Sequence, residues 1–504
     1  MVDLALNFQT LSPEYQRVIA LAEEQHGITI TSLQELSGGR SGASIHLVRV
    51  ASRETDQVEH LVLKLDRIRP KASSDEIARH KLVQEISPAD FVETHVPELA
   101  FDRVDTEEAL AIIYTIAGQS LHNFRTLSSY RRQNQLKRLL TETNHILLDV
   151  WNKDLRIETI AHPQELLTTW LGFRLEAGQK IEKFIQEVCR LPHDTPGFLV
   201  QGNLLPNPLQ YARQPYAWST VRAFDAIIGL QHSDLNTNNI LARFTRDDAL
   251  AGYYLIDFAL FKESIPLLFD QRYLEMSYLI DALHRSSLDS VISLLNLYSQ
   301  HDVLDVDQTP VEMAGVSAAI SASRQSFGAW VVANHPSLQD DLWGQYWLAG
   351  TAAGLGYTHK AGMPEDLRLA GLIYAAANLK RFLNLFGLPT PSGASEIIPS
   401  PSMEDQPDSR RTRPQLQHHN LPPTLTSFIG RRGDVDRLKE LVLREDVHLV
   451  TLTGPGGTGK TRFALEVAGR LLEGFTDGVH FVDLSGVSDP GLVISTIAHT
   501  LGIR

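Results

Sequence analysis

The chain has a single cysteine, Cys189, among its 504 residues. One cysteine cannot form an intramolecular disulfide, which suits a reducing compartment, and its apolar, helix-like surroundings favour a packed small side chain over a reactive thiol. The sequence also lacks a basic-then-apolar leader at its start and any apolar run of about 18 residues, the length that a bilayer crossing needs. We therefore expect a soluble, cytoplasmic protein with no membrane partner.

The sequence also has no excess of basic residues. The chain carries 46 Lys and Arg against 60 Asp and Glu, a formal net charge of −14. Nucleic acid is therefore not expected as a partner, because phosphate backbones bind basic surfaces. A transcription regulator would need a DNA-binding domain, and the sequence shows none.

A proline-rich segment divides the chain, which at 504 residues is long enough for two or three domains. Residues 389–420 hold six prolines among polar residues, a composition that predicts a disordered linker. Residues 1–120 contain short β-rich runs separated by turns, with one helical stretch from Asp75 to Gln84, which predicts an antiparallel sheet and a helix.

Residues 121–388 have mainly the amphipathic period of helices, for example in Leu166–Val188 and Leu367–Phe386. A short β-like island at residues 229–258 interrupts them. A small sheet lobe followed by a helical lobe predicts a bilobal α+β domain.

The β-like island contains the pattern His232-Ser-Asp234-Leu-Asn-Thr-Asn-Asn239, and a later strand ends in Asp257. Phosphoryl transfer needs one carboxylate that orients or deprotonates the attacking hydroxyl, and oxygen ligands that hold Mg²⁺ against the phosphates. The pattern predicts Asp234 as the catalytic residue and Asn239 and Asp257 as magnesium ligands.

The sheet lobe offers complementary groups. Lys64 lies between two leucines on a predicted strand, so it faces the opposite side and can reach the phosphates of a nucleotide. Glu76, with Glu85 as the fallback, is the predicted partner that fixes this lysine. Backbone N–H groups can approach phosphate oxygens at the glycines that precede the first strand, namely Gly38, Gly39 and Gly42.

In this order the motifs resemble the aminoglycoside phosphotransferase and choline kinase branch of the protein-kinase-like fold, over about residues 30–385. The resemblance implies the same roles for the residues named above, and an adenine-binding hinge around Tyr114–Gly118. Two departures leave a binding-only relative open. Ala259 replaces the glycine after Asp257-Phe258, and Asn236 stands where protein kinases usually carry a lysine.

A second motif lies near the C-terminal end, where Gly454-Pro-Gly-Gly-Thr-Gly-Lys460-Thr461 follows a predicted strand at Val447–Thr453 and precedes a predicted helix. This context is typical of a phosphate-binding loop. Lys460 is predicted to neutralise the β- and γ-phosphates, and Thr461 to ligate Mg²⁺. The backbone that cradles the phosphates is supplied by the glycines Gly454, Gly456, Gly457 and Gly459.

Residues 421–504 resemble the start of the NB-ARC ATPases of the STAND class, through Leu421–Arg431, a helix at Gly433–Leu443 and a later strand at Val479–Leu484. Asp483 comes too early for the acidic strand that would order the attacking water. We therefore expect an incomplete P-loop domain from a longer protein that does not hydrolyse nucleotide by itself. The resemblance implies self-association in the full-length protein.

The sequence as a whole predicts an α+β bilobal kinase-like domain at residues 1–388, a linker, and a truncated α/β P-loop NTPase domain at residues 421–504. The expected function is ATP-binding signalling, with a phosphotransferase effector coupled to a nucleotide switch. The alternative is an inactive kinase-like scaffold regulated by the P-loop module. ATP or ADP and Mg²⁺ are the expected cofactors, and the phosphate acceptor is an unknown small molecule or protein.

Overall fold

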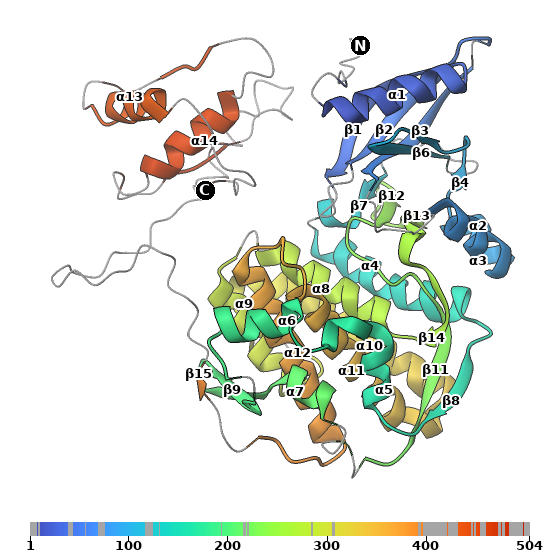
Figure 1. The fold of residues 1–504 in the computed structure, drawn as a ribbon, viewed down its shortest axis with the longest axis vertical. Coiled ribbons are helices and arrows are strands. Elements are labelled where there is room, and N and C mark those ends of the chain that lie inside the picture. The colour runs from blue at the N-terminus through green and yellow to red at the C-terminus, as the bar shows by residue number, and fades with distance from the viewer. Residues whose placement is uncertain are drawn as a thin grey trace. The chain divides into compact units, whose positions relative to one another are not determined.

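The computed structural model divides into two compact units, Met1–Ser400 and Pro401–Arg504. Each is mixed α/β or helical in its described parts, and Figure 1 labels their elements. Among the described helices, none combines the length and the apolar character that a bilayer crossing needs. The structure describes residues 8, 11–38, 44–55, 57–68, 76–115, 124–130, 132–192, 194–214, 218, 221–283, 286–304, 308–391, 395–396, 421, 432–444, 447, 450–453, 460–471, 475, 479–482 and 497.

The first unit begins with an antiparallel sheet in the order β1-β2-β3-β6-β4, with β5 paired to β6. Helix α1 (Pro13–Gln25) lies along one face of this sheet (Figure 1). The antiparallel sheet predicted from the β-rich runs is therefore present. Its strands are β1 (Ile28–Gly38), β2 (Ser44–Ser52), β3 (Val58–Arg67), β4 (Glu98–Leu99), β5 (Val104–Asp105) and β6 (Ala109–Thr115).

Strand β3 is buried on both faces, and its side chains alternate between two clusters. Leu61, Leu63 and Leu65 pack with α1 in one apolar cluster. Val62 belongs to a second cluster on the opposite face. Lys64 shares the side of Val62, as the alternation predicts. A charged side chain is thereby placed in the interior of the unit.

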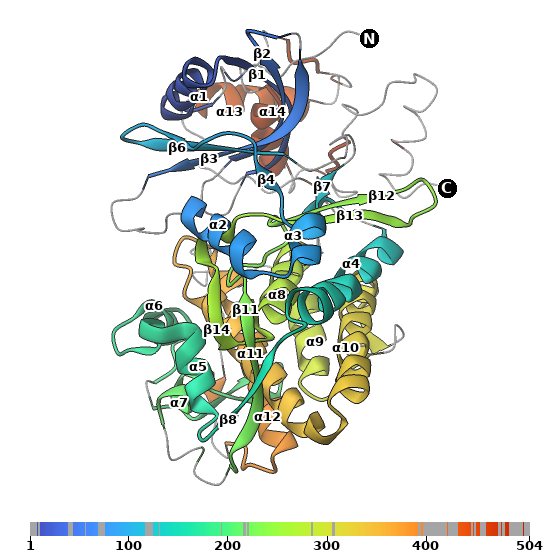
Figure 2. The ribbon, with the colours of Figure 1, turned by 90° about the vertical axis from the view of Figure 1, so that its right-hand side faces the viewer.

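Two helices follow β3 and lie between the sheet and the larger helical part (Figure 2). Helix α2 (Glu76–Ile86) begins one residue after the predicted start and ends two residues beyond the predicted end. Helix α3 (Ala89–His95) follows it. Strand β6 (Ala109–Thr115) then returns to the sheet beside β3.

The helical part has one extensive core that reaches from α4 to α12. Helices α11 and α12 run side by side at its centre, and nearly every residue of α11 is buried. Cys189 lies in this core, and burial raises the pKa of its thiol to about 12, as expected for a packed side chain. The longer helices are α4 (Gln133–His145), α8 (Phe269–Leu283), α9 (Leu288–Tyr298), α10 (Ala314–Asn334), α11 (Gln339–Thr358) and α12 (Glu365–Leu385).

Small sheets are more numerous here than the single predicted β-like island. Three three-stranded sheets have the orders β13-β12-β7, β14-β11-β8 and β10-β9-β15. Several of these strands are short and half-exposed, which hides them from a hydrophobic-period analysis. Their bounds are β7 (Arg125–Thr126), β8 (Arg156–Ile160), β9 (Gly197–Val200), β10 (Asn203–Pro206), β11 (Phe224–Gln231), β12 (Ile240–Phe244), β13 (Leu250–Leu255), β14 (Lys262–Pro266) and β15 (Ser395–Glu396).

The helical stretch predicted for Leu166–Val188 is helical but divided into separate short helices. Helix α5 (Gln164–Leu171) ends at Gly172, whose φ of 52° lies in the left-handed region that glycine adopts readily. A second glycine, Gly178, has a φ of 75° and separates α5 from α6 (Lys180–Lys183). The helical period of the sequence conceals these two breaks. Helix α7 (Pro208–Arg213) is a further short helix of this region.

The first residues of the predicted linker pack on the first unit. Strand β15 (Ser395–Glu396) pairs in parallel with β9. Pro391 is buried and lies so close to Gly197 that a side chain there would collide with it. Residues 397–420, the rest of the predicted linker, lie outside the described residues.

In the second unit, α13 (Arg432–Val442) and α14 (Lys460–Leu471) pack through a small core of Val435, Val467 and Leu471. Both helices match the predicted ones. The strand predicted at Val447–Thr453 is not found in its described residues 447 and 450–453, which are half-buried or exposed. A β-strand forms only when its backbone is hydrogen-bonded to a neighbouring strand. Among the described residues of this unit, the one position with β-bridge pairing is Val479.

Candidate functional site

Lys64 is the centre of the site in the first unit. Its side chain is 3% exposed, and its Nζ lies 2.8 Å from Glu76 Oε2 and 2.9 Å from Asp257 Oδ1. The ion pair that the sequence predicted between Lys64 and Glu76 is therefore present, and Asp257 completes it. Strand β3, helix α2 and the turn after β13 meet at this one ammonium group.

The charges of this trio depend on one another. Burial alone would lower the pKa of Lys64, but the nearby carboxylates of Asp257 and Glu76 outweigh it and raise that pKa. Burial raises the pKa of Glu76, which Lys64 only partly offsets. For Asp257 the attraction of Lys64 outweighs burial and lowers the pKa. Lys64 thus stays charged, with Asp257 as its ionised partner.

Tyr114 completes the buried side of the trio. Its hydroxyl donates a 2.8 Å hydrogen bond to Glu76 Oε1, and burial raises its pKa well above the ordinary value. Both oxygens of Glu76 are thus bonded, one to Lys64 and one to Tyr114. Tyr114 also begins the predicted hinge, whose residues 116–118 lie outside the described residues.

Asp234 and Asn239 lie on the loop that joins β11 to β12. Asn239 Nδ2 donates a 2.9 Å hydrogen bond to the backbone oxygen of Asp234, and Asn236 Nδ2 donates to the same oxygen at 3.1 Å. These bonds close the loop on itself and fix both amide groups. With its nitrogen engaged inward, Asn239 keeps its side-chain oxygen as an acceptor.

Asp257 follows β13 and has a φ of 68°. A left-handed conformation is costly for a residue other than glycine, and such residues cluster at functional sites. The backbone N–H of Ala259 donates to the Asp257 carboxylate. This bond and the Lys64 contact hold the aspartate in place, and the following residues form the short helix Phe258–Leu260.

Asp270 is a site residue that the sequence analysis missed. It lies in the first turn of α8, and its carboxylate accepts the backbone N–H groups of His232 at 2.7 Å and Ser233 at 2.8 Å. Burial raises its pKa to about 6. Its one sequence signal is an acidic residue at the start of a helix, which by itself predicts only a favourable interaction with the helix dipole.

A cleft of about 390 Å³ brings the predicted residues together. Asp234, Asn239 and Asp257 line it, together with Ile45 from the sheet and Tyr273 from α8. The hydroxyl of Tyr273 faces the Asp234 carboxylate, and burial, ahead of the Asp234 charge, raises the Tyr273 pKa well above the ordinary value.

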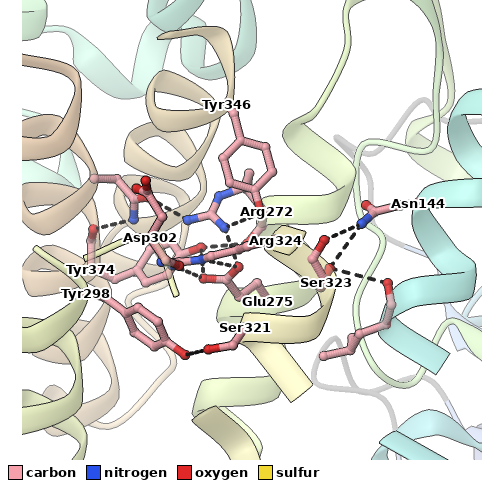
Figure 3. A network of polar contacts seen from close by, with 12 residues as sticks. Asn144, Arg272, Glu275, Tyr298, Asp302, Ser321, Ser323, Arg324, Tyr346 and Tyr374 are labelled. Carbon is pink, nitrogen blue, oxygen red and sulfur yellow. Dashed lines mark hydrogen bonds and ion pairs between the residues drawn. The ribbon is translucent and has the colours of Figure 1, made fainter. Parts of the chain in front are cut away.

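Helix α8, which carries Asp270 and Tyr273, is anchored by a buried charge network. Figure 3 shows Arg272 and Arg324 converging on Glu275. Arg324 Nη2 lies 2.7 Å from Glu275 Oε1, and the hydroxyl of Tyr374 donates to the same oxygen at 3.1 Å. Tyr346 accepts from Arg272 Nη1 at 2.9 Å. The network ties α8 to α10, α11 and α12.

The phosphate-cradling backbone predicted from glycine positions is mostly outside the described residues. Gly38 is the last residue of β1, while Gly39 and Gly42 are not described. In the second unit Lys460 and Thr461 are the first residues of α14, where the positive end of the helix dipole favours an anion. The loop glycines before them also lie outside the described residues, namely Gly454, Gly456, Gly457 and Gly459.

Comparisons with known proteins give partial matches. No protein-family model matches the chain. An uncharacterized protein of Mycobacterium tuberculosis is 38% identical over 85 residues, which are 17% of this chain and 21% of that protein. A putative HTH-type transcriptional regulator of the same species is 44% identical over 55 residues, 11% of this chain and 6% of that protein.

Regulatory protein AfsR of Streptomyces coelicolor is 31% identical over 99 residues, which are 17% of this chain and 10% of that protein. The chain thus spans about a fifth or less of the length of each of these three relatives. Two of these three relatives are named as regulators, one of them putative, and each is similar to this chain over a short segment only.

Proposed function

We propose that the first unit is a bilobal, kinase-like phosphotransferase that binds ATP in the cleft at Lys64, Asp234 and Asp257. The observation that carries the proposal is the position of Lys64. Burying a lysine between two carboxylates from different elements carries a large desolvation cost. This group of charges stands beside a cleft that is also lined by the Asp234 carboxylate and the Asn239 amide. Phosphate binding accounts for that arrangement.

Each residue then has a defined task. Lys64, fixed by Glu76, neutralises phosphate oxygens, and the Asp234 carboxylate accepts the proton of the attacking hydroxyl. The Tyr273 hydroxyl, which faces the Asp234 carboxylate, positions that side chain. Asp270 holds the backbone of the loop that presents Asp234.

The donor set also fits a magnesium ion. Asn239 offers an amide oxygen, and Asp257 offers the carboxylate oxygen that Lys64 does not occupy. Within the described ranges, no three His, Cys, Asp or Glu side chains converge as a metal site, so the cation would depend on these two ligands, water and phosphate oxygens. Bound there, Mg²⁺ would supply charge neutralisation of the transferring phosphate.

The second unit is proposed as part of a STAND-type nucleotide switch with Lys460 and Thr461 at its phosphate site. Two observations support it: α14 begins at Lys460 directly after the glycine-rich sequence, and two of the matched relatives are named as regulators. ATP or ADP in that site would set the signalling state of the protein.

A test of the phosphotransferase has to separate the two nucleotide sites. ADP formation from Mg-ATP by the full chain is measured in a Lys460→Ala background, which removes the P-loop contribution. Asp234→Ala in that background should lower turnover at least about a hundredfold, the usual contribution of a positioned base. The matched control Asp247→Ala removes an exposed aspartate of the β12–β13 hairpin and should leave turnover unchanged.

The second candidate is a binding-only scaffold. It is favoured by Asn236, whose amide is used to close the loop and which brings no positive charge to the cleft. Nucleotide binding by calorimetry with no turnover above that of Asp234→Ala would establish it and overturn the phosphotransferase.

A further inference from the structure

One wall of the cleft is basic and is not used by any task assigned above. Arg174, His359 and Lys360 line it together with Gly356 and Met363. These residues come from the helical part of the unit. The other charged residues that line the cleft are Asp234 and Asp257, and both already have roles in phosphoryl transfer.

Tyr273 places this wall next to the catalytic carboxylate. Its hydroxyl faces Asp234 closely enough for that carboxylate to raise its pKa, and the Lys360 ammonium lies 5.2 Å from the centre of its ring. The same ammonium lies 4.7 Å from the ring of Tyr357, so two aromatic faces hold it. Arg174 is also near enough to Tyr273 to act on its hydroxyl electrostatically. Tyr273 therefore lies between the Lys360 ammonium, which packs on its ring, and the carboxylate of the proposed base, which its hydroxyl faces.

The surroundings add positive charge. Burial and the neighbouring cations Arg174, Lys180 and Arg368 lower the pKa of His359 to about 4, so this imidazole is neutral at pH 7. On the other side, burial, Arg174 and Arg79 lower the pKa of Lys262. Among the described residues, no carboxylate forms an ion pair with Arg174, so the positive charge of Arg174 remains available to a ligand.

We propose that the phosphate acceptor is a small hydroxylated molecule that carries a carboxylate or phosphate group. Its anionic group binds Arg174 and Lys360, and its hydroxyl lies at Asp234. This assignment rests on the proposed phosphotransferase function and names its substrate class. An arginine at one end of such a site favours planar anions through paired N–H donors.

The transfer is balanced with ATP as the donor. The acceptor hydroxyl oxygen forms a bond to the γ-phosphorus while its proton passes to the Asp234 carboxylate. The bond from the γ-phosphorus to the β,γ-bridging oxygen breaks, and ADP leaves with that electron pair. The acceptor leaves as a phosphate ester.

The experiment compares acceptors of matched size in the 504-residue chain that carries Lys460→Ala. Glycerate and glycerol 3-phosphate represent the two anionic groups, glycerol is the neutral analogue, and choline is the cationic one. ADP formation is recorded for each, and binding of each to the protein is measured separately by calorimetry. We expect one anionic compound or both to bind and to stimulate turnover, and the neutral and cationic compounds to do neither.

Substitutions of Arg174 and Lys360 test whether these two residues bind the anionic group. Arg174→Gln should raise the KM or Kd for the anionic compound about tenfold, the loss of one charge-assisted pair. Lys360→Met, which keeps the packing on Tyr273, should act in the same direction. Arg156→Gln, which removes an arginine paired with Glu158 on the surface, should leave both constants unchanged.

The possible failures are distinct. Stimulation by glycerol or choline in preference to the anions, or anion binding that Arg174→Gln does not weaken, overturns the acceptor assignment and leaves the phosphotransferase standing. Anion binding that depends on Arg174, without turnover of any compound, overturns phosphoryl transfer and retains the anion site. Absence of both binding and turnover overturns both.

Discussion

Lys64 and Asp257 form a 2.9 Å ion pair that joins the N-terminal sheet to the turn after β13. The lysine is held on its other side by Glu76. Lys64 and Glu76 are nearly free of solvent, and Asp257 is 20% exposed at the cleft, so removal of the lysine leaves two largely buried carboxylates without their shared cation. The pair therefore joins two parts of the first unit, and we expect it to contribute both to stability and to the proposed nucleotide binding.

Replacement of Lys64 should lower the stability of the first unit and abolish ATP binding in its cleft. Lys64→Met leaves the Glu76 and Asp257 carboxylates without their shared cation, and we expect the free energy of unfolding to fall by about 3 kcal/mol. Urea denaturation followed by tryptophan fluorescence measures this, since all six tryptophans lie in the first unit. ATP binding in the Lys460→Ala background should be lost in the same variant.

The matched control for this prediction is Lys153→Met, which breaks a surface pair with Asp90 at 3.0 Å. Exposed pairs contribute about 1 kcal/mol or less. Glu76→Gln in the Lys64→Met background should restore part of the lost stability, because it removes one of the two stranded charges. Equal losses in Lys64→Met and Lys153→Met would contradict the central role given to Lys64.

Asp270 and His80 should make the stability of the first unit depend on pH in opposite directions. The folded-state pKa of Asp270 is about 6, above its ordinary value of 3.8, so the folded state binds the extra proton. This contribution is fully present below about pH 4 and is lost as the pH rises to about 6, and by linkage it amounts to about 3 kcal/mol.

The folded-state pKa of His80 is about 4, below its ordinary value of 6.5, because of burial. Here the unfolded state binds the extra proton, so the contribution is present above about pH 6.5 and is lost as the pH falls to about 4. The two effects nearly cancel in the wild type, and single variants separate them. Unfolding free energies of Asp270→Asn should rise with pH relative to wild type, and those of His80→Gln should fall. Parallel pH profiles for all three proteins would refute the linkage.

Local patterns in the sequence were enough to identify three polar residues that line the cleft, Asp234, Asn239 and Asp257, and the lysine beside it. The alternation of β3 puts Lys64 on the side opposite its leucine neighbours, and the spacing of Asp234 and Asn239 puts both on one loop. Helix α12 (Glu365–Leu385) was likewise predicted to within two residues. In each case short-range periodicity carries the information.

Long-range packing was not visible in the same way. Arg272 and Glu275 are fully buried on α8, where charged residues in a helix would normally predict an exposed face. Their partner Arg324 lies on α10, and no local pattern connects the two helices. Asp270 was missed for the same reason, since its function is to bind the backbone of another segment.

The buried network of Figure 3 should be intolerant of the loss of the Glu275 carboxylate. Glu275→Gln leaves Arg272 and Arg324, both at most 1% exposed, without a counter-charge. We expect a loss of about 3 to 5 kcal/mol in unfolding free energy. Asp302→Asn removes a carboxylate of the same region that is 45% exposed and paired with Arg381, and should cost about 1 kcal/mol or less. Equal effects would mean that Glu275 does not hold the network.

The contact between α11 and α12 should depend on glycine at position 354. A Cβ there would lie 2.4 Å from the backbone oxygen of Gly371 and 2.6 Å from the backbone nitrogen of Ala375. Neither atom can move without displacing α12, so Gly354→Ala should cost about 2 kcal/mol or more through overpacking. Gly315→Ala, where a Cβ meets nothing within 4 Å, should instead stabilise the protein by about 0.5 kcal/mol.

Gly354→Ala should also change the geometry of the cleft, because α11 (Gln339–Thr358) ends just before His359 and Lys360, which line it. A displaced α11 moves the Lys360 ammonium away from the Tyr273 ring, so Gly354→Ala should weaken binding of an anionic acceptor, while Gly315→Ala leaves it unchanged. Calorimetry on both variants, at a temperature where each is fully folded, separates this effect from lost stability. Unaltered acceptor binding in a destabilised Gly354→Ala protein would show that the basic wall does not depend on the packing of α11 against α12.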